Sequence, residues 1–445
     1  DLIFGGTGND TIWGENGNDT IYAKAGNNSI YGGENDDIIY AGTGLDIIDG
    51  GNGEDTLRFD GANTRVVVNL GADTLTYDTN QTLATNRFIN SWKNGGANQV
   101  GTATNIENVD GTNYNDTIRG NDSINSIRAG AGDDYIFGSY NNDYINGGTH
   151  TNGDWLDYSL ITTYNGINID LEYQRNAVFK TEAAGDDHNQ VLDGIEHIIG
   201  TAQNDLIQGT LSFGNTLRGG DGADTIKGVG GSNYLYGDGG NDTIFSGTGN
   251  DYIDGGSGTN TVSYVEFSAN VRVNISDSTQ SGVLSMRGMS GSMTDTLVSI
   301  QNVTTGSGAD TIWGSSATNT INSGAGNDTI YTIGGDDNYV YAGSAADVVY
   351  GAAGRDTIYG EDGNDTIIAS GSNDYIDGNG DIDIVNYSAS TQGLNITLAN
   401  SGALTTITLG AGNGISAGGF TDSLYNIEGL VGSSTATNIL IGNNM

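Results

Sequence analysis

Residues 5–13 read Gly5-Gly6-Thr7-Gly8-Asn9-Asp10-Thr11-Ile12-Trp13, and variants of this stretch recur every nine residues through the start of the chain. Each glycine-rich stretch ends on an acid or amide, and an aliphatic residue follows two places later. The acid or amide positions are Asp1, Asp10, Asp19, Asn28, Asp37, Asp46 and Asp55. A turn, an acid and a short apolar segment at a fixed period predict an all-β fold, a parallel β-roll solenoid of short stacked strands.

The composition agrees with a solenoid. Of 445 residues, 74 are Gly, and Pro and Cys are both absent. Ordinary usage of about 5% would give roughly 22 prolines. Proline cannot donate a hydrogen bond to a strand ladder, and nearly every strand of a solenoid lies between two others. The absence of Cys excludes disulfides and thiolate metal sites, so another kind of cross-link must hold the coils together.

The charge of the chain excludes several classes of partner. Lys and Arg total 14 against 55 Asp and Glu, which gives a formal net charge of −41. Such an acidic surface repels nucleic acids and anionic membranes. No apolar run approaches the roughly 18 residues of a membrane-spanning helix, so we expect no membrane span. The regular spacing of the acids favours ligands over a disordered acidic tail.

The nine-residue period divides the chain into four rolls separated by longer interludes. The rolls are residues 1–57, 111–157, 200–262 and 306–385, the interludes are 58–110, 158–199, 263–305 and 386–431, and 432–445 begin a further roll. Within the third and fourth rolls, the steps that lead to Asn215 and Asp347 are ten residues long. The second roll reaches Asp154 after a two-residue insertion.

The interludes resemble one another. Each begins with alternating apolar residues, typical of a half-buried strand: 66–70, 167–171, 271–275 and 394–398. Each ends on a related signature, Asn105-Ile106-Glu107-Asn108, Gly194-Ile195-Glu196-His197, Ser299-Ile300-Gln301-Asn302 or Asn426-Ile427-Glu428-Gly429. We expect the interludes to be wider coils of the same solenoid. Loops that bulge from the solenoid are the alternative.

The acids of successive coils are expected to bind Ca²⁺ at multiple sites. With two nonapeptides per coil, acids 18 residues apart share one side of the roll, about 4.8 Å apart, where their charges repel. A cation between them removes the repulsion, and Ca²⁺ accepts six to eight oxygen ligands in irregular geometry. The predicted metal ligands are Asp10, Asp19, Asp37, Asp46, Asp55, Asp116, Asp134, Asp143, Asp205, Asp224, Asp242, Asp251, Asp310, Asp328, Asp337, Asp347, Asp356, Asp365, Asp374 and Asp383. An isolated Asp would be interpreted as a turn residue instead.

Asparagine replaces aspartate at some positions of the repeat, where we expect weaker metal binding. Asn28 lies in a unit in which Lys24 replaces a glycine, so the sites beside Asn28 are predicted to be weak or empty. Asn125, Asn215, Asn233 and Asn319 are interpreted as amide ladders, in which side-chain amides hydrogen-bond along one edge. In the third roll, this arrangement places Ca²⁺ along Asp205, Asp224 and Asp242.

Aromatic residues recur at the last position of the repeat and are expected to stack along one side of the roll: Trp13, Tyr22, Tyr31, Tyr40, Trp313, Tyr331 and Tyr359. Neighbours on adjacent strands stabilise each other in this way. A stripe that binds a surface glycan or another partner is the functional alternative.

No constellation typical of an enzyme occurs, so the chain is predicted not to be one. The three histidines form no zinc motif of the H-E-x-x-H kind, and we expect them to be surface or structural residues. Asp186-Asp187-His188 is a weaker candidate for an extra metal site.

The nonapeptides resemble the RTX, or haemolysin-type, calcium-binding repeats, and the interludes resemble those of long multi-repeat RTX proteins. This resemblance covers almost the whole chain. It implies an extracellular protein, secreted through a type I system, whose folding is triggered by extracellular calcium.

Three functions are consistent with these features. The first is a cell-surface fibre, sheath or surface-layer protein stiffened by Ca²⁺. The second is the accessory repeat region of a secreted enzyme or toxin, and the third is an adhesin that binds surface glycans. Both ends of the sequence fall inside a repeat. We therefore expect head-to-tail self-association or continuation in a longer chain.

Overall fold

The fold is known from a computed structural model. It describes residues 1–59, 62, 64–71, 91–94, 101–139, 141–162, 165–172, 177–179, 188–276, 293–334, 337–369, 371–390, 395–397, 405–409, 420–436 and 438–441. Every regular element in these ranges is a β-strand, and no helix occurs in them. The chain divides into two compact units, Asp1–Asp224 and Thr225–Met445.

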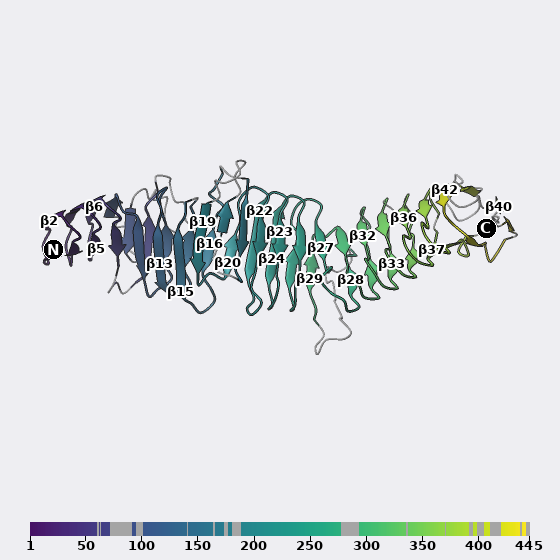
Figure 1. The fold of residues 1–445 in the computed structure, drawn as a ribbon, viewed down its shortest axis with the longest axis horizontal. Helices are drawn as coiled ribbons and strands as arrows, with labels where there is room; N and C mark the ends of the chain where they lie inside the picture. Colours follow the sequence, from purple (N-terminus) through teal and green to yellow (C-terminus); the bar gives the residue numbers. More distant parts are fainter. Residues whose placement is uncertain are drawn as a thin grey trace. The chain divides into compact units, whose positions relative to one another are not determined.

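The first unit is a roll with two rows of parallel strands (Figure 1). One row contains β1 (Leu2–Phe4), β3 (Thr20–Tyr22), β5 (Ile38–Tyr40), β7 (Thr56–Arg58), β11 (Asn108–Thr112), β13 (Ser126–Ala131), β15 (Tyr144–Thr149) and β19 (His188–Asp193), followed by β18 (Ala177–Phe179), β17 (Ile167–Asp170) and β21 (Leu206–Gln208). The other contains β2 (Thr11–Asn16), β4 (Ser29–Glu34), β6 (Ile47–Asn52), β10 (Gly101–Thr104), β9 (Ser91–Asn94), β8 (Val66–Asn69), β12 (Thr117–Arg119), β14 (Tyr135–Phe137), β16 (Trp155–Asp157), β20 (His197–Ile199) and β22 (Thr216–Asp221).

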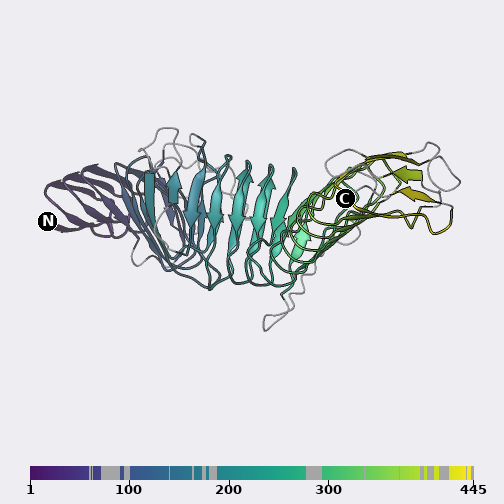
Figure 2. The same cartoon turned by 45° about the vertical axis from the view of Figure 1, so that its right-hand side comes forward.

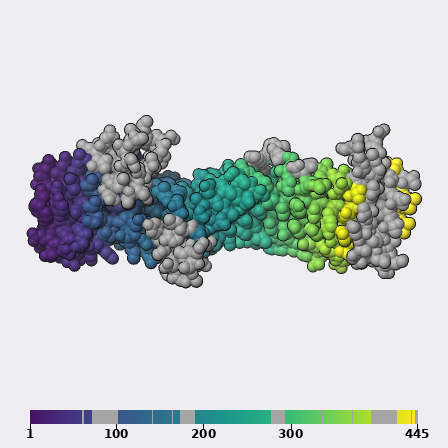
Figure 3. All heavy atoms as spheres, turned by 90° about the horizontal axis from the view of Figure 1, so that it is seen from above, coloured from purple at the N-terminus to yellow at the C-terminus, as the bar shows by residue number. Residues whose placement is uncertain are grey.

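The strand register shows that one coil holds two nonapeptides. Ile3 pairs with Ile21, and Ile21 pairs with Ile39, each 18 residues further on. The aliphatic residue of each strand points inward, and Ile21, Ile39 and Leu57 are fully buried. Figure 3 shows the residues at the purple, N-terminal end as closely packed atoms on the visible face. The predicted parallel β-roll is therefore confirmed, with a core built from one aliphatic side chain per strand.

The second unit repeats this arrangement, and Figure 2 shows its successive parallel strands in teal and green. One row contains β23 (Thr225–Lys227), β25 (Thr243–Phe245), β27 (Thr261–Ser263), β30 (Asn302–Thr304), β32 (Thr320–Asn322), β34 (Tyr339–Tyr341), β36 (Thr357–Tyr359), β38 (Tyr375–Asp377), β42 (Phe420–Tyr425) and β41 (Thr405–Leu409). Opposite are β24 (Tyr234–Gly239), β26 (Tyr252–Asp254) and β29 (Thr296–Val298), then β28 (Arg272–Asn274), β31 (Thr311–Trp313), β33 (Thr329–Tyr331), β35 (Val348–Tyr350), β37 (Thr366–Ile368), β39 (Ile384–Asn386) and β43 (Gly429–Val431). β40 (Asn395–Thr397) pairs with β44 (Ile439–Ile441).

The interludes continue the roll, as the alternating strands predict. At each interlude, one row runs straight through by a parallel pairing: β7 with β11, β16 with β20, β27 with β30, and β39 with β43. In the first interlude, the opposite row gains an antiparallel excursion from β8 to β9 to β10. The second interlude has the same kind of excursion, from β17 to β18 to β19. Each of the first two interludes is thus a coil with an antiparallel insertion on one side.

A buried aromatic ring marks the start of every interlude. Phe59, Tyr158, Tyr264 and Tyr387 are at most 1% exposed. The tyrosine hydroxyls have polar partners: Tyr158 donates to Gln190 Oε1 (2.5 Å), Tyr264 to Asp295 Oδ2 (3.2 Å) and Tyr387 to Asp422 Oδ2 (2.7 Å). In the first interlude the ring is Phe59, which has no hydroxyl. The strand position that holds Gln190, Asp295 or Asp422 in the other interludes is there occupied by Gly101. The ring fills the space that opens where the nonapeptide pattern stops.

Candidate calcium-binding sites

The acids of successive coils line up in rows because the strands that follow them pair in register. Within a row, the backbone N–H of each acid donates to Oδ1 of the acid in the next coil. The distance is 2.8 Å from Asp19 to Asp37 and from Asp37 to Asp55, and 2.7 Å from Asp310 to Asp328. One carboxylate oxygen is therefore used by the backbone ladder.

The second oxygen of many of these acids is buried without a hydrogen-bond partner among the described residues. These orphaned Oδ2 atoms belong to Asp19, Asp37, Asp46, Asp55, Asp134, Asp154, Asp251, Asp310, Asp328, Asp347, Asp365 and Asp383. A buried carboxylate without a counter-charge is strongly unfavourable. Two such charges about 4.8 Å apart repel by roughly 3 kcal/mol at an effective dielectric constant of about 20. The rows therefore need cations, or protons in their absence, to neutralise these carboxylates.

Glycine leaves room for a cation beside these oxygens. A Cβ on Gly32 would lie 2.4 Å from Asp37 Oδ2 and 2.3 Å from the Gly50 carbonyl oxygen. The same relation holds at Gly14, next to Asp19 Oδ2 and the Gly32 carbonyl oxygen, and at Gly378, next to Asp383 Oδ2 and the Asn426 carbonyl oxygen. A carboxylate oxygen and a carbonyl oxygen thus converge on a space that any side chain would close.

The donors in these spaces suit Ca²⁺. They are all oxygens, part carboxylate and part backbone carbonyl, in a setting without regular octahedral geometry, which is the ligand set that Ca²⁺ accepts and Mg²⁺ disfavours. The residues that would hold Ca²⁺ are the aspartates with orphaned Oδ2 atoms, together with carbonyl oxygens of the neighbouring glycine turns. When bound, Ca²⁺ supplies the positive charge that lets these carboxylates be buried.

Without a cation, the rows favour protonated carboxyls. Burial, together with the charges of Asp328 and Asp365, raises the pKa of Asp347 to about 8. Burial is also the main cause that raises the pKa of Asp55, Asp134, Asp328 and Asp383 to about 7.

Other predicted ligands already have partners for the second oxygen. Oδ2 of Asp10, Asp116 and Asp205 accepts a backbone N–H from Gly6, Thr112 and Thr201, respectively (2.6–2.7 Å). Asp143 Oδ2 accepts from Ser139 and from Gln190 Nε2, and Asp356 Oδ2 accepts from Thr332 and Ala352. Asp224, Asp242 and Asp374 are buried on the same rows.

The register predicted for Asp337 is wrong. Asn338 occupies the buried position, where its Oδ1 accepts the backbone N–H of Asn319 and its own N–H donates to Asp356 Oδ1. The ten-residue step therefore leads to Asn338, not to Asp347. Asp337 is displaced onto the exposed turn, where it pairs with Arg355 at 2.6 Å. Asp and Asn are adjacent here, so the spacing of acids alone favoured the wrong one.

At three of the asparagine positions, the side-chain NH₂ group donates to backbone carbonyls of the turns. Asn28 Nδ2 donates to the carbonyls of Ala23 and Gly26, Asn125 Nδ2 to Glu107, and Asn319 Nδ2 to Gln301. Asn125 Nδ2 also donates to the side-chain amide oxygen of Asn121, four residues earlier in the same turn (2.9 Å). An amide NH₂ thus satisfies carbonyl oxygens of the turns without a metal.

The closing signature of each interlude contributes residues that sequence reasoning did not assign to the rows. A side-chain oxygen of Glu107, Glu196, Gln301 or Glu428 accepts the backbone N–H of the last row residue before it, at 2.7–3.0 Å. Those row residues are Asp55, Asp154, Asn260 and Asp383. Asp295 and Asp422 likewise extend rows, through Asp251 and Asp374. The recurrence of Ile-Glu or Ile-Gln in the closing signatures was the signal, but the row residues that these side chains contact are 41 or more positions away in the sequence.

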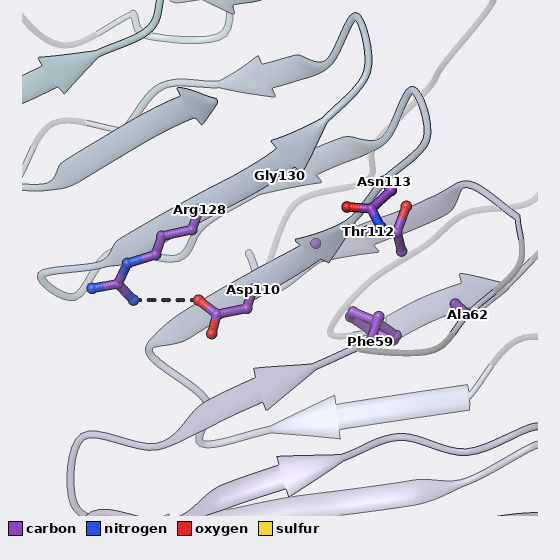
Figure 4. A pocket seen from close by; sticks show the side chains of 8 residues that line it. Phe59, Ala62, Asp110, Thr112, Asn113, Arg128 and Gly130 are labelled. Carbon is purple, nitrogen blue, oxygen red and sulfur yellow. Dashed lines mark hydrogen bonds and ion pairs between the residues drawn. The ribbon is translucent and has the colours of Figure 1, made fainter. Parts of the chain in front are cut away.

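Three further features lie outside the rows: a cavity, the aromatic stacks and the candidate Asp186-Asp187-His188 site. The cavity, of about 330 Å³ in the first unit, is lined by Phe59, Ala62 and Asp110–Asn113, with Arg128 and Gly130. Figure 4 shows the ion pair between Asp110 and Arg128 at its edge, 3.3 Å long. The predicted aromatic stacking is confirmed in pairs such as Trp13–Tyr31, Tyr22–Tyr40 and Trp313–Tyr331. The expectation of a single side is wrong, because Trp13 and Tyr31 lie on the row of β2 and β4 and Tyr22 and Tyr40 on the row of β3 and β5. The candidate Asp186-Asp187-His188 site falls largely outside the described residues.

Comparison with known proteins identifies the repeat. A sequence profile of the RTX calcium-binding nonapeptide repeat matches residues 1–66, 119–149, 192–262, 302–330 and 334–385, more than half of the chain. No curated protein matches the sequence. In the described ranges, no helix has the length and hydropathy that crossing a membrane requires. Proteins with these repeats bind Ca²⁺ and are typically secreted. The rows of buried aspartates and the profile agree, and the chain belongs to the RTX calcium-binding repeat family, with multiple sites for Ca²⁺.

Proposed function

We propose that this chain is a secreted, non-catalytic structural protein of the cell surface. It folds on extracellular Ca²⁺ and assembles as a fibre, sheath or surface layer. The observation that carries this proposal is the continuity of the roll within each unit: the interludes keep the parallel pairing, so almost every described element belongs to the same repetitive scaffold.

Calcium-coupled folding follows from the rows. An apo chain with a net charge of −41 must bury the orphaned carboxylates without counter-ions, so the free energy of Ca²⁺ binding becomes free energy of folding. In the extracellular medium Ca²⁺ is available, whereas in the cytosol it is scarce. The chain would therefore stay expanded until it is exported.

Assembly is supported by exposed apolar strands. Leu2 and Phe4 of β1 are 63% and 57% exposed, and Ile439 and Ile441 of β44 are 54% and 51% exposed. Unpaired strand edges template further pairing, and repetition of a head-to-tail contact makes open filaments. We propose that a second copy of the chain pairs with these edges.

Two kinds of measurement test Ca²⁺-coupled folding and assembly separately. Circular dichroism with increasing Ca²⁺ at pH 8 tests folding; a strand signal that survives complete removal of Ca²⁺ at this pH would contradict coupled folding. Electron microscopy and analytical ultracentrifugation of the Ca²⁺-loaded chain test assembly. Filaments or concentration-dependent oligomers support head-to-tail association, and a monodisperse monomer at all concentrations contradicts it.

A glycan-binding adhesin is the second candidate, favoured by the exposed aromatic stack of the first roll. Trp13 is 60% exposed and stacks on Tyr31, which is 38% exposed, with centroids 5.8 Å apart. Flat exposed rings are suited to packing against sugar faces. A glycan array probed with the Ca²⁺-loaded protein and with Trp13→Ala tests this function, and equal binding by both proteins would exclude a role for the stack.

A further inference from the structure

The end of the second roll differs from the other roll ends because a histidine lies beside the last aspartate. His150 belongs to the two-residue insertion that precedes Asp154. Its Nδ1 lies 3.1 Å from Glu196 Oε2 and 3.6 Å from Asp154 Oδ2. Glu196 comes from the closing signature of the next interlude and reaches this point because β16 pairs with β20.

We propose that His150, Asp154 and Glu196 form a binding site for a first-row divalent metal ion, Zn²⁺ foremost, which takes the place of Ca²⁺ at this end of the Asp154 row. The three ligand atoms all lie within 4.8 Å of one another. Tetrahedral zinc bonds of about 2.0–2.1 Å place neighbouring ligand atoms roughly 3.3 Å apart. The two distances from Nδ1 bracket this value, so one ion can contact the three atoms after small side-chain movements.

The buried member of the cluster points independently to a cation. The Asp154 side chain is fully buried, and its Oδ2 has no hydrogen-bond partner among the described residues. A Cβ on Gly147 would lie 2.5 Å from this oxygen and 2.2 Å from the Gly194 carbonyl oxygen. The carboxylate thus faces a space that glycine keeps open, with a further oxygen at its wall.

His197, which follows Glu196 in the sequence, does not compete with His150 as the nitrogen ligand of the metal ion. His197 Nδ1 accepts the backbone N–H of Thr216, and its Nε2 lies 3.0 Å from the Asn152 carbonyl oxygen. Both nitrogens of His197 are therefore used within the fold. His150 is about one-third exposed, so its imidazole can meet an ion that arrives from solvent.

Other roll ends provide an internal comparison. At the end of the first roll, Glu107 accepts the N–H of Asp55, and at the end of the fourth, Glu428 accepts that of Asp383, as Glu196 does for Asp154. Gly51 and Asn379, four residues before those aspartates, offer no imidazole. Oxygen-only ligand sets suit Ca²⁺, whereas an imidazole nitrogen favours Zn²⁺ and related ions. The insertion changes the class of metal that this one end prefers.

Isothermal titration of the full Ca²⁺-saturated chain with Zn²⁺ tests the proposal. We expect one tight equivalent, with affinity reduced about tenfold or more in His150→Gln and in Glu196→Gln. Glu107→Gln is the matched control, because it changes the same junction position where no histidine is present, and its Zn²⁺ affinity should equal that of the unmodified chain. Ca²⁺-dependent circular dichroism verifies that each variant folds.

A second measurement uses the unmodified chain and so does not depend on the folding of variants. Co²⁺ in place of Zn²⁺ should give the intense visible bands of a four- or five-coordinate site with a nitrogen ligand. Weak octahedral bands would overturn the proposal. So would Zn²⁺ affinity that His150→Gln leaves unchanged, or the absence of a tight equivalent, which would make His150 only a counter-ion for the two acids.

Discussion

At the scale of single residues, the two carboxylate oxygens of each aspartate in the rows have different partners. Oδ1 belongs to the backbone ladder, and only Oδ2 is available for Ca²⁺. The state of Oδ2 therefore distinguishes Ca²⁺ ligands from aspartates that are internally satisfied. Asp347 and Asp356 illustrate the difference, because both are 1% exposed and both accept a row N–H on Oδ1.

We predict that Asp347→Asn lowers the number of bound Ca²⁺ ions by one or two per chain. Asp347 Oδ2 is orphaned, so this substitution removes a negative ligand from the row formed by Asp310, Asp328, Asp347, Asp365 and Asp383. Asp356→Asn is the control, because Thr332 and Ala352 already satisfy its Oδ2. Equilibrium dialysis measures the stoichiometry; equal losses in both variants would contradict the assignment.

At the scale of the turn, glycine has two functions that substitutions can separate. Gly17 has a φ of +112° but open space around its Cα, whereas Gly32 faces Asp37 Oδ2 and the Gly50 carbonyl oxygen. Gly17 thus provides backbone freedom, and Gly32 provides the space for the cation.

We therefore expect Gly32→Ala to shift the Ca²⁺ midpoint of folding strongly upward, since a methyl group would fill the space beside Asp37. Gly17→Ala should cost only the strain of the left-handed backbone, of order 1–3 kcal/mol, without loss of a bound ion. Calcium titrations followed by circular dichroism, together with Ca²⁺ stoichiometry, distinguish the two effects. An unchanged stoichiometry in Gly32→Ala would show that the cation lies elsewhere.

At the interludes, the buried tyrosines connect the inserted coil to the rows. Tyr387→Phe should destabilise the Ca²⁺-loaded protein by about 1–3 kcal/mol, because Asp422 Oδ2 would lose its buried donor. Tyr350→Phe is the control, since Tyr350 is 38% exposed and stacks on Tyr331. Chemical denaturation in saturating Ca²⁺ measures both variants, and similar losses would argue against a specific role for the buried hydroxyl.

At the scale of the whole molecule, we expect the rows to couple folding to pH as well as to Ca²⁺. In the apo fold, burial raises the pKa of the row aspartates from 3.8, to about 6 for Asp365, about 7 for Asp55 and about 8 for Asp347. Between roughly pH 4 and pH 8, the folded apo chain therefore binds more protons than the unfolded chain, and its stability falls as the pH rises.

Calcium-free protein should accordingly show more strand signal at pH 5 than at pH 8. Saturating Ca²⁺ should remove most of this difference at pH 8, and protons should weaken Ca²⁺ binding at pH 5. Circular dichroism of the metal-depleted chain across this range checks the prediction. A calcium-free strand signal that grows with rising pH would contradict the burial of unpaired carboxylates.

Much of this architecture could be predicted from the sequence, because the period of nine is local information. The spacing of Asp19, Asp37 and Asp55 fixes the coil length, the row and the inward face of Ile21 and Ile39. Asp337 shows the limit of this local information. The spacing does not decide which of the adjacent residues Asp337 and Asn338 takes the row position, and only the pairing of β34 with β32 and β36 places Asn338 there.

The sequence by itself determined the parallel roll, its two-nonapeptide coil and its Ca²⁺-binding repeats, since each follows from which residue types recur at one spacing. Tertiary structure decided which carboxylate oxygens lack partners, because Thr112, Thr201 and Thr332 satisfy some acids and not others. It also decided how the rows cross the interludes. Contacts such as Glu196 with Asp154 and His150 join residues more than 40 positions apart, and no local period records how many residues an inserted coil contains.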